Sequence, residues 1–116
     1  MTSAPTIDRA TFEALEQTTG ADFVRELVDT FLQEAPAMLD ELRNALAAKD
    51  ADKFRRSAHS LKSNGNTFGA LTLGAMAREL ELGGMATVIE RDGQPLDELA
   101  KEYSRVAAAL TELCRE

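Results

Sequence analysis

The chain has 116 residues, of which 44% are hydrophobic and 5% aromatic, enough for one domain with a single core. A net charge of −7 argues against a nucleic-acid partner, and no run of about 18 apolar residues is available to span a membrane. The single cysteine, Cys114, excludes an internal disulfide, and the first residues lack the pattern of a signal peptide. We therefore expect a cytoplasmic protein, with residues 1–5 as a disordered tail and residues 6–116 as one helical domain.

Helical periodicity begins with two segments in the first half of the chain. The first is a short helix between Asp8, which would cap its N-terminus, and Gly20, which would end it. The second runs from about Asp22 to Lys49 and continues through Pro36, whose missing N–H predicts a kink. The predicted apolar face of this second helix consists of Phe23, Leu27, Phe31, Ala35, Met38, Leu42 and Leu46.

Three further helices are predicted in the second half. The third runs from about Asp50 to Phe68, and the fourth runs from about Ala70 to Gly83, where two consecutive glycines mark its end. Residues 91–95 form a turn, and the last helix follows it with apolar residues at the spacing of a bundle seam. These are Leu96, Leu99, Tyr103, Val106, Leu110 and Leu113. The fold class is therefore all-α, an antiparallel four-helix bundle with a short additional N-terminal helix.

The only histidine, His59, falls on the polar face of the third helix. At 100° per residue, the centre of the apolar face of this helix lies roughly 140° away from His59. The residues within about 60° of it are polar or basic, namely Arg55, Arg56, Lys62, Ser63 and Asn66. Residues 49–66 contain five basic and two acidic residues, a local charge of +3 that leaves −10 for the rest of the chain. We therefore expect His59 to be exposed inside a basic strip.

These neighbours suit chemistry on phosphate. Neutral imidazole is a good nucleophile because its unperturbed pKa is about 6.5. If His59 accepts a phosphoryl group, Lys62 can pair with the new negative charge, and Arg55 and Arg56 can attract an acidic partner. The helical wheel alone fits an ordinary surface histidine as well. Gly65 fits either the close approach of a partner or close helix packing.

Helix register brings a carboxylate level with the histidine. Gly69 is typical of a helix C-cap, so the third and fourth helices should form a hairpin that turns near Gly69 and Ala70. Equal rise along the two helices then places Glu81 opposite His59. A carboxylate there could hold Nδ1–H of the ring and present Nε2 outward, and the alternative is that Glu81 is simply an exposed helix residue.

The string "AHSLKSNGNTFGA" at residues 58–70, followed by "ARELE", resembles the signature of histidine-containing phosphotransfer (Hpt) domains of multistep two-component phosphorelays. The resemblance implies that His59 takes a phosphoryl group from a receiver-domain aspartate and passes it to another receiver. It implies that Lys62 steadies the phosphoryl oxygens and that Glu81 orients the imidazole. We expect Arg55, Arg56, Ser63 and Asn66 to contact the partner. Ser63 departs from the family, which usually has glycine directly after the lysine.

The chain has no glycine-rich nucleotide loop, so we expect no ATP site, no cofactor and no metal of its own. The receiver would bring Mg²⁺ together with its aspartate. The expected partners are receiver domains, with a hybrid sensor histidine kinase as one source of them, and the default oligomeric state is a monomer. One alternative is a non-catalytic module that binds a receiver or a partner helix. Another is a phosphatase that releases phosphate to solution.

Overall fold

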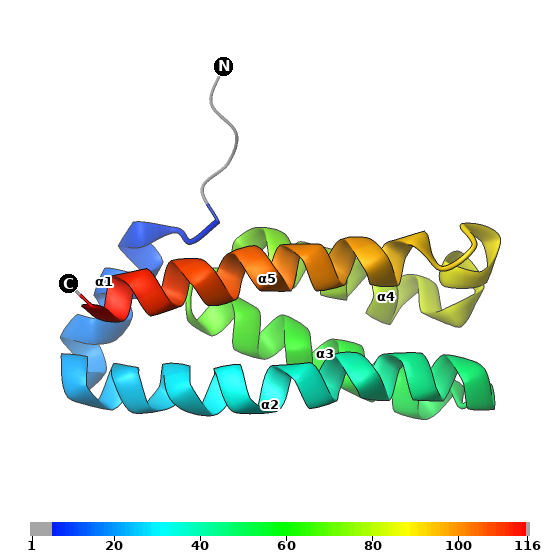
Figure 1. Cartoon of the computed structure of the whole chain (residues 1–116), viewed down its shortest axis with the longest axis horizontal. Helices are drawn as coiled ribbons and strands as arrows, with labels where there is room; N and C mark the ends of the chain where they lie inside the picture. Colours follow the sequence, from blue (N-terminus) through cyan, green and yellow to red (C-terminus); the bar gives the residue numbers. More distant parts are fainter. Residues whose placement is uncertain (1–5, 116) are drawn as a thin grey trace, which may run out of the picture.

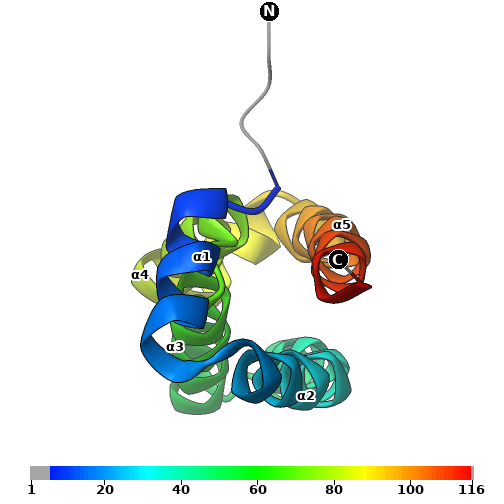
Figure 2. The ribbon, with the colours of Figure 1, turned by 90° about the vertical axis from the view of Figure 1, so that its left-hand side faces the viewer.

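The computed structural model describes residues 6–115, and within this range the chain forms five helices and no strand. The helices are α1 (Arg9–Thr19), α2 (Ala21–Ala48), α3 (Ala51–Thr67), α4 (Leu71–Glu90) and α5 (Gln94–Arg115). Helices α2 to α5 run alternately in opposite directions around one core (Figure 1). Seen from its end, the bundle has these four helices at its corners, and α1 covers that end against α2 and α3 (Figure 2). The predicted four-helix bundle with an additional N-terminal helix is confirmed.

Two aspartates begin helices where the sequence predicts them. The Asp8 carboxylate accepts a hydrogen bond from the Thr11 amide at 3.1 Å and caps α1. The Asp50 carboxylate accepts one from the Lys53 amide at 3.1 Å and caps α3. Each bond satisfies an amide that has no partner inside its own helix, so these helix starts are local properties of the sequence.

The turn between α3 and α4 is closed by Gly69, which has a φ of +87°. The Ala70 amide donates to the Gly65 carbonyl at 2.8 Å and the Gly69 amide donates to the Asn66 carbonyl at 3.1 Å, a Schellman arrangement. The Asp8 amide donates to the Gly69 carbonyl at 2.8 Å, so the start of α1 is bound to this turn. The turn thereby sets the register in which α3 and α4 pack.

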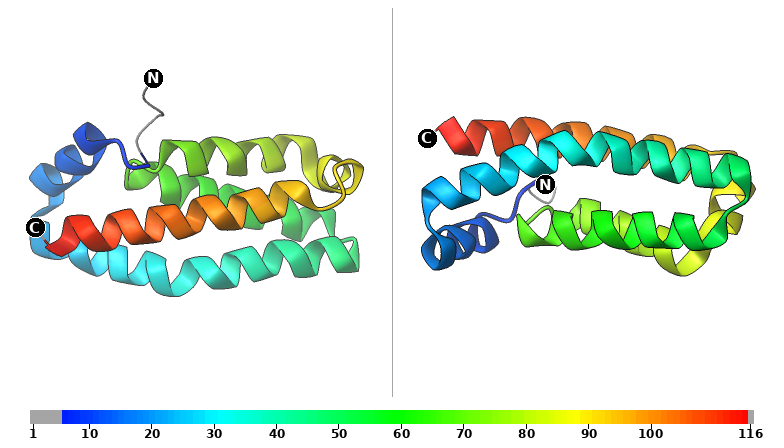
Figure 3. Two further views of the ribbon diagram at one scale, coloured as in Figure 1. Left: turned by 45° about the horizontal axis from the view of Figure 1, so that its top comes forward. Right: turned by 90° about the horizontal axis from the view of Figure 1, so that it is seen from below.

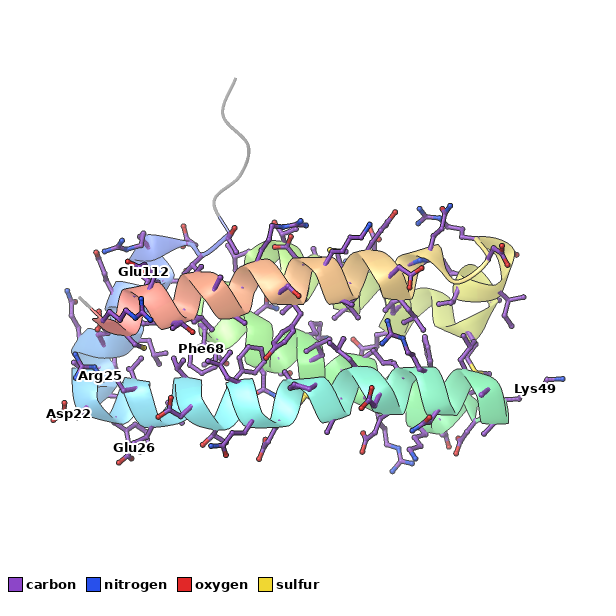
Figure 4. All side chains as sticks on the ribbon, viewed as in Figure 1. Asp22, Arg25, Glu26, Lys49, Phe68 and Glu112 are labelled. Carbon is purple, nitrogen blue, oxygen red and sulfur yellow. The ribbon has the colours of Figure 1, made fainter. Side chains whose placement is uncertain are left out.

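The core lies between the four long helices. From α3 it receives Phe54, Ala58 and Leu61, all fully buried, as the helical wheel predicts. The Phe31 and Phe68 rings meet with centroids 5.4 Å apart, and Phe68 lies inside the bundle in Figure 4. Among residues 6–115, the buried core residues are Ile7, Phe12, Val24, Val28, Phe31, Ala35, Leu42, Ala45, Phe54, Ala58, Leu61, Phe68, Ala70, Leu73, Ala77, Leu80, Val88, Leu96, Leu99, Val106 and Leu110.

In the first half of α2, the buried face differs from the predicted one. Phe23 is 49% exposed, whereas Val24 and Val28 are 1% exposed and belong to the core. Phe23 lies on the predicted stripe of the helix, and Val24 and Val28 lie on the stripe next to it. Packing against the other helices decides which of the two stripes is buried. The helix itself continues through Pro36, as predicted, and its ribbon is unbroken in both views of Figure 3.

The fourth helix extends beyond its predicted end. Gly84 has a φ of +68° and a ψ of −166°, so the regular helix does stop at the glycine pair. A second helical segment then continues in a new direction to Glu90, and its Val88 is buried. The prediction missed this segment because it is short and has a single buried apolar residue.

None of the helices within residues 6–115 is long and apolar enough to cross a membrane. The predicted tail, residues 1–5, lies outside the described residues.

Candidate functional site

The imidazole of His59 lies on the outer face of α3, and its side chain is 56% exposed. Its Nδ1 atom is 2.7 Å from the Oε2 atom of Glu81, which comes from α4. Because a carboxylate only accepts, Nδ1 carries the hydrogen of this bond. In the neutral ring, Nε2 is then the atom that holds the free lone pair. The position of Glu81 level with His59 is the one that helix register predicts.

The second oxygen of the same carboxylate binds Lys62. The Nζ atom of Lys62 donates to Glu81 Oε1 at 2.7 Å, so the ring and the ammonium each hold one oxygen. The side chains of Lys62 and Glu81 are 24% and 15% exposed, so this pair is more sheltered than the imidazole. The hydrogen bond from Lys62, followed by that from His59, lowers the pKa of Glu81 below its ordinary value of 4.5, against the opposing effect of desolvation. The carboxylate is therefore ionised at neutral pH.

The four predicted docking residues are all exposed on α3. Arg55 pairs with the Asp52 carboxylate at 3.7 Å, and the Nε atom of Arg56 donates to the Asp52 carbonyl at 3.4 Å. Ser63 and Asn66 follow further along the helix. The amide group of Asn66 lies over Gly74, where a side chain would collide with it. The structure thus places these residues on one accessible surface.

The surroundings of Gly65 decide between the two interpretations of this residue, the close approach of a partner and close helix packing. It is buried, and a Cβ atom built on it would lie 3.5 Å from the Ala70 carbonyl oxygen and 3.5 Å from Leu73 Cδ2. The residue therefore lies inside the contact of α3 with α4, where a Cβ atom would meet only ordinary van der Waals neighbours. The idea that Gly65 leaves space beside the imidazole for a partner is wrong, because its surface is already covered by α4.

Two features around the basic strip were missed by the sequence analysis. Leu82, directly after Glu81 on α4, is 70% exposed. A cleft of about 430 Å³ lies between α2 and α3. In it the Ser57 hydroxyl donates to the Glu41 carboxylate at 3.1 Å. The cleft is lined by Glu41, Lys53, Arg56, Ser57 and Ser60. Pairing of α2 with α3 is a long-range property, so no local signal marks this cleft.

Among residues 6–115 no cluster of three or more histidine, cysteine, aspartate or glutamate side chains could hold a metal ion.

The thiol of Cys114 lies near the C-terminal end of α5 and is partly buried. Burial raises its pKa above the ordinary value, with an opposing contribution from Arg25. The thiol is therefore largely protonated at neutral pH and weakly nucleophilic.

Comparisons with known proteins identify the family of the chain. The model of the Hpt domain family matches residues 26–115, and the chain therefore belongs to the Hpt domain family. The crystal structure of histidine-containing phosphotransfer protein B (HptB) from Pseudomonas aeruginosa PAO1 superposes with a TM-score of 0.87. The two chains are 27% identical, and the match covers 97% of each.

A curated relative is the sensor protein TorS of Escherichia coli strain K12, which is 34% identical over 65 residues. These residues are 56% of this chain and 7% of TorS, so the chain spans only a small part of that relative's length. The family assignment that the motif suggested is confirmed, and with it a histidine-phosphotransfer role in a phosphorelay.

Proposed function

We propose that His59 is the phosphoryl carrier of this domain, accepting a phosphoryl group from a receiver-domain aspartate and passing it to another receiver. The observation that carries the proposal is the 2.7 Å hydrogen bond from His59 Nδ1 to Glu81 on a ring that is 56% exposed. This bond leaves Nε2 as the nucleophilic atom of an accessible imidazole. Membership of the Hpt domain family supports the same conclusion.

In the incoming transfer, the Nε2 lone pair attacks the phosphorus of the receiver's aspartyl phosphate. The bond from phosphorus to the aspartate oxygen breaks, and its electron pair returns to the carboxylate. The ring keeps its hydrogen on Nδ1 throughout, and the outgoing transfer is the reverse reaction with a second receiver. Phosphoryl transfer needs alignment and charge neutralisation more than covalent work by the protein. In this proposal the receiver supplies Mg²⁺, and this chain binds no nucleotide.

Lys62 has two possible partners during this cycle. Before phosphorylation its ammonium is held by Glu81 at 2.7 Å. A lysine ammonium has three donors, so Lys62 can keep its contact with Glu81 and also donate to a phosphoryl oxygen on His59. Glu81 therefore positions the two groups that the transfer requires.

The exposed residues around His59 provide the docking surface of the proposal. Arg55 and Arg56 are a cationic edge for an acidic partner, while Ser63 and Asn66 offer polar contacts. Leu82 adds an apolar contact that excludes water. Receiver domains are the proposed partners, and the similarity to the sensor protein TorS makes a hybrid sensor kinase one place where such a domain could act.

The experiment loads a panel of receiver domains with phosphate, mixes each with this protein and follows the label by intact mass. His59→Gln is compared with the wild type, and Lys101→Gln is the matched control because Lys101 is an exposed residue of α5. We expect acid-labile label on the wild type and the control, and none on His59→Gln.

The other outcomes separate the rival functions. Loss of receiver label as free phosphate, with none on this protein, would identify a phosphatase. Binding that survives His59→Gln without any transfer across the panel would identify a non-catalytic docking module. Either result would overturn the proposed function.

A further inference from the structure

The side chain that holds the imidazole is a charged carboxylate, although a neutral amide could orient the ring equally well. A glutamine oxygen in the same place could also accept a hydrogen bond from Nδ1–H. Glu81 instead brings a full negative charge 2.7 Å from the ring, and the lowered pKa of Glu81 means that this charge persists at neutral pH. The question is what the charge contributes once His59 carries a phosphoryl group.

The hydrogen on Nδ1 affects how the bond between Nε2 and phosphorus breaks. When Nε2 of the neutral ring bonds to phosphorus, the ring becomes a cation as long as Nδ1 keeps its hydrogen. If the bond then breaks with its electron pair on Nε2, the leaving group is neutral imidazole. If Nδ1 has lost its hydrogen beforehand, the leaving group is imidazolate, a far stronger base and a far poorer leaving group. The Nδ1 hydrogen thus decides how readily the phosphoryl group moves on.

We propose that the negative charge of Glu81 holds the hydrogen on Nδ1 of phosphorylated His59, so that the outgoing transfer releases neutral imidazole. This inference rests on the proposed function for its biological meaning, but the protonation it describes is a property of the phosphorylated domain alone. Glu81 is a positioning residue here, because it acts on phosphorus only through the ring.

The charges around the ring support this assignment. The phosphoryl group carries a charge of about −1.5 to −2, and Glu81 carries a charge of −1. The cationic form of the ring between them is therefore favoured. The cations Arg55 and Arg56, one turn before His59 on α3, oppose a ring cation. Arg55 is paired with the Asp52 carboxylate, whereas Arg56 donates to the Asp52 backbone carbonyl and keeps its charge. Lys62 holds the other oxygen of Glu81. From the neighbouring helices, Arg78 lies one turn before Glu81 on α4, and Glu41 of α2 is bonded to Ser57. These groups remain in any Glu81 variant, so a comparison isolates its charge.

The test phosphorylates the protein with phosphoramidate, a chemical donor that needs no receiver. The midpoint of Nδ1 deprotonation in the phosphorylated domain is then measured from ring proton and ³¹P resonances between pH 5 and pH 10. The variants are Glu81→Gln, which removes the charge and keeps the acceptor, and Glu81→Asp, which keeps the charge. Glu79→Gln is the matched control, because it removes an exposed carboxylate from the same helix.

A carboxylate at hydrogen-bonding distance shifts such equilibria by roughly one unit or more. We expect the midpoint to fall by about one pH unit in Glu81→Gln, and to stay unchanged in Glu79→Gln and close to the wild type in Glu81→Asp. The ratio of the wild-type transfer rate to the Glu81→Gln rate should then be about tenfold larger at a pH above both midpoints than well below them, where only the loss of positioning remains.

Two results would overturn the inference. One is an unchanged midpoint in Glu81→Gln, with a transfer rate that falls by the same factor at every pH, because this is the signature of orientation alone. The other is an equal fall in Glu81→Asp, because the charge is then not the cause. If no receiver exchanges phosphate with His59 while the midpoint shifts as expected, the proposed function fails and the inference about Glu81 stands.

Discussion

At the scale of single residues, Glu81 connects the histidine to the rest of the fold. It comes from α4, whereas both of its partners, His59 and Lys62, come from α3 one turn apart. One carboxylate thus ties two side chains of the neighbouring helix. The pair with Lys62 is largely sheltered from water, so solvent and salt weaken it less than the exposed ion pairs elsewhere in the bundle.

The first prediction concerns acid stability. The pKa of Glu81 in the folded protein lies below its ordinary value of 4.5. A depressed pKa means that ionised Glu81 stabilises the fold at pH values above 4.5, and that this stabilisation disappears as the pH falls through the folded value. We expect Glu81→Gln to lower the free energy of unfolding at pH 7, and we expect its difference from the wild type to narrow as the pH falls below 4.5.

Urea denaturation of both proteins across this pH range measures the difference. Glu79→Gln, which removes an exposed carboxylate two residues away, serves as the control and should parallel the wild type. A stability gap between Glu81→Gln and the wild type that is equally large at pH 3 would show that the carboxylate charge is not responsible.

At the scale of elements, the turn between α3 and α4 decides whether the site forms. Gly69 closes that turn at a φ of +87°, and a Cβ atom on it would lie 2.7 Å from the Asp8 carbonyl oxygen. Gly65, one helical turn earlier, is buried but has no neighbour closer than 3.5 Å to a built Cβ atom. The two glycines of one motif therefore have different structural roles.

The second prediction contrasts alanine at these positions. Gly69→Ala places a side chain in the left-handed region and against backbone of α1, so we expect a loss of roughly 2 kcal/mol or more in the free energy of unfolding. Gly65→Ala meets only ordinary contacts and gains helix propensity, so we expect no loss and a gain of up to about 1 kcal/mol. Chemical denaturation checks both values, and equal destabilisation by the two variants would contradict this account of the turn.

At the scale of the whole molecule, charge is distributed unevenly. The chain carries −7 in total, yet residues 49–66 carry +3 around His59. Helix α5 packs against α2 and α4 and lies diagonally across the bundle from α3 (Figure 2). An acidic partner is therefore attracted to one face of an otherwise acidic surface.

The third prediction tests this attraction. Arg56→Glu reverses a charge in the basic strip, and Lys101→Glu makes the same change in net charge on α5. We expect Arg56→Glu to slow transfer from a limiting receiver several-fold at low ionic strength, with a smaller effect at high salt. The rate at saturating receiver should change little. A comparable slowing by Lys101→Glu would show that net charge, and not the strip, governs the encounter.

Local signals in the sequence determined much of this protein. The caps at Asp8 and Asp50, the stop at Gly69 and the helical periodicity predict helix positions, because each depends on hydrogen bonds or spacing within a few residues. The exposure of His59 follows from the same periodicity. The level position of Glu81 follows from the turn and equal helix rise.

Only the tertiary structure decided which surfaces meet. It buried Val24 and Val28 in place of Phe23, covered Gly65 with α4 and opened the cleft between α2 and α3. In the folded protein the Glu81 carboxylate also binds Lys62, in addition to His59. These outcomes depend on contacts between residues far apart in the chain. Two neighbouring stripes of one helix are both apolar enough to be buried, and a charged side chain has several groups within reach to which it can bind. Periodicity defines the stripes of a helix, and packing selects the one that is buried.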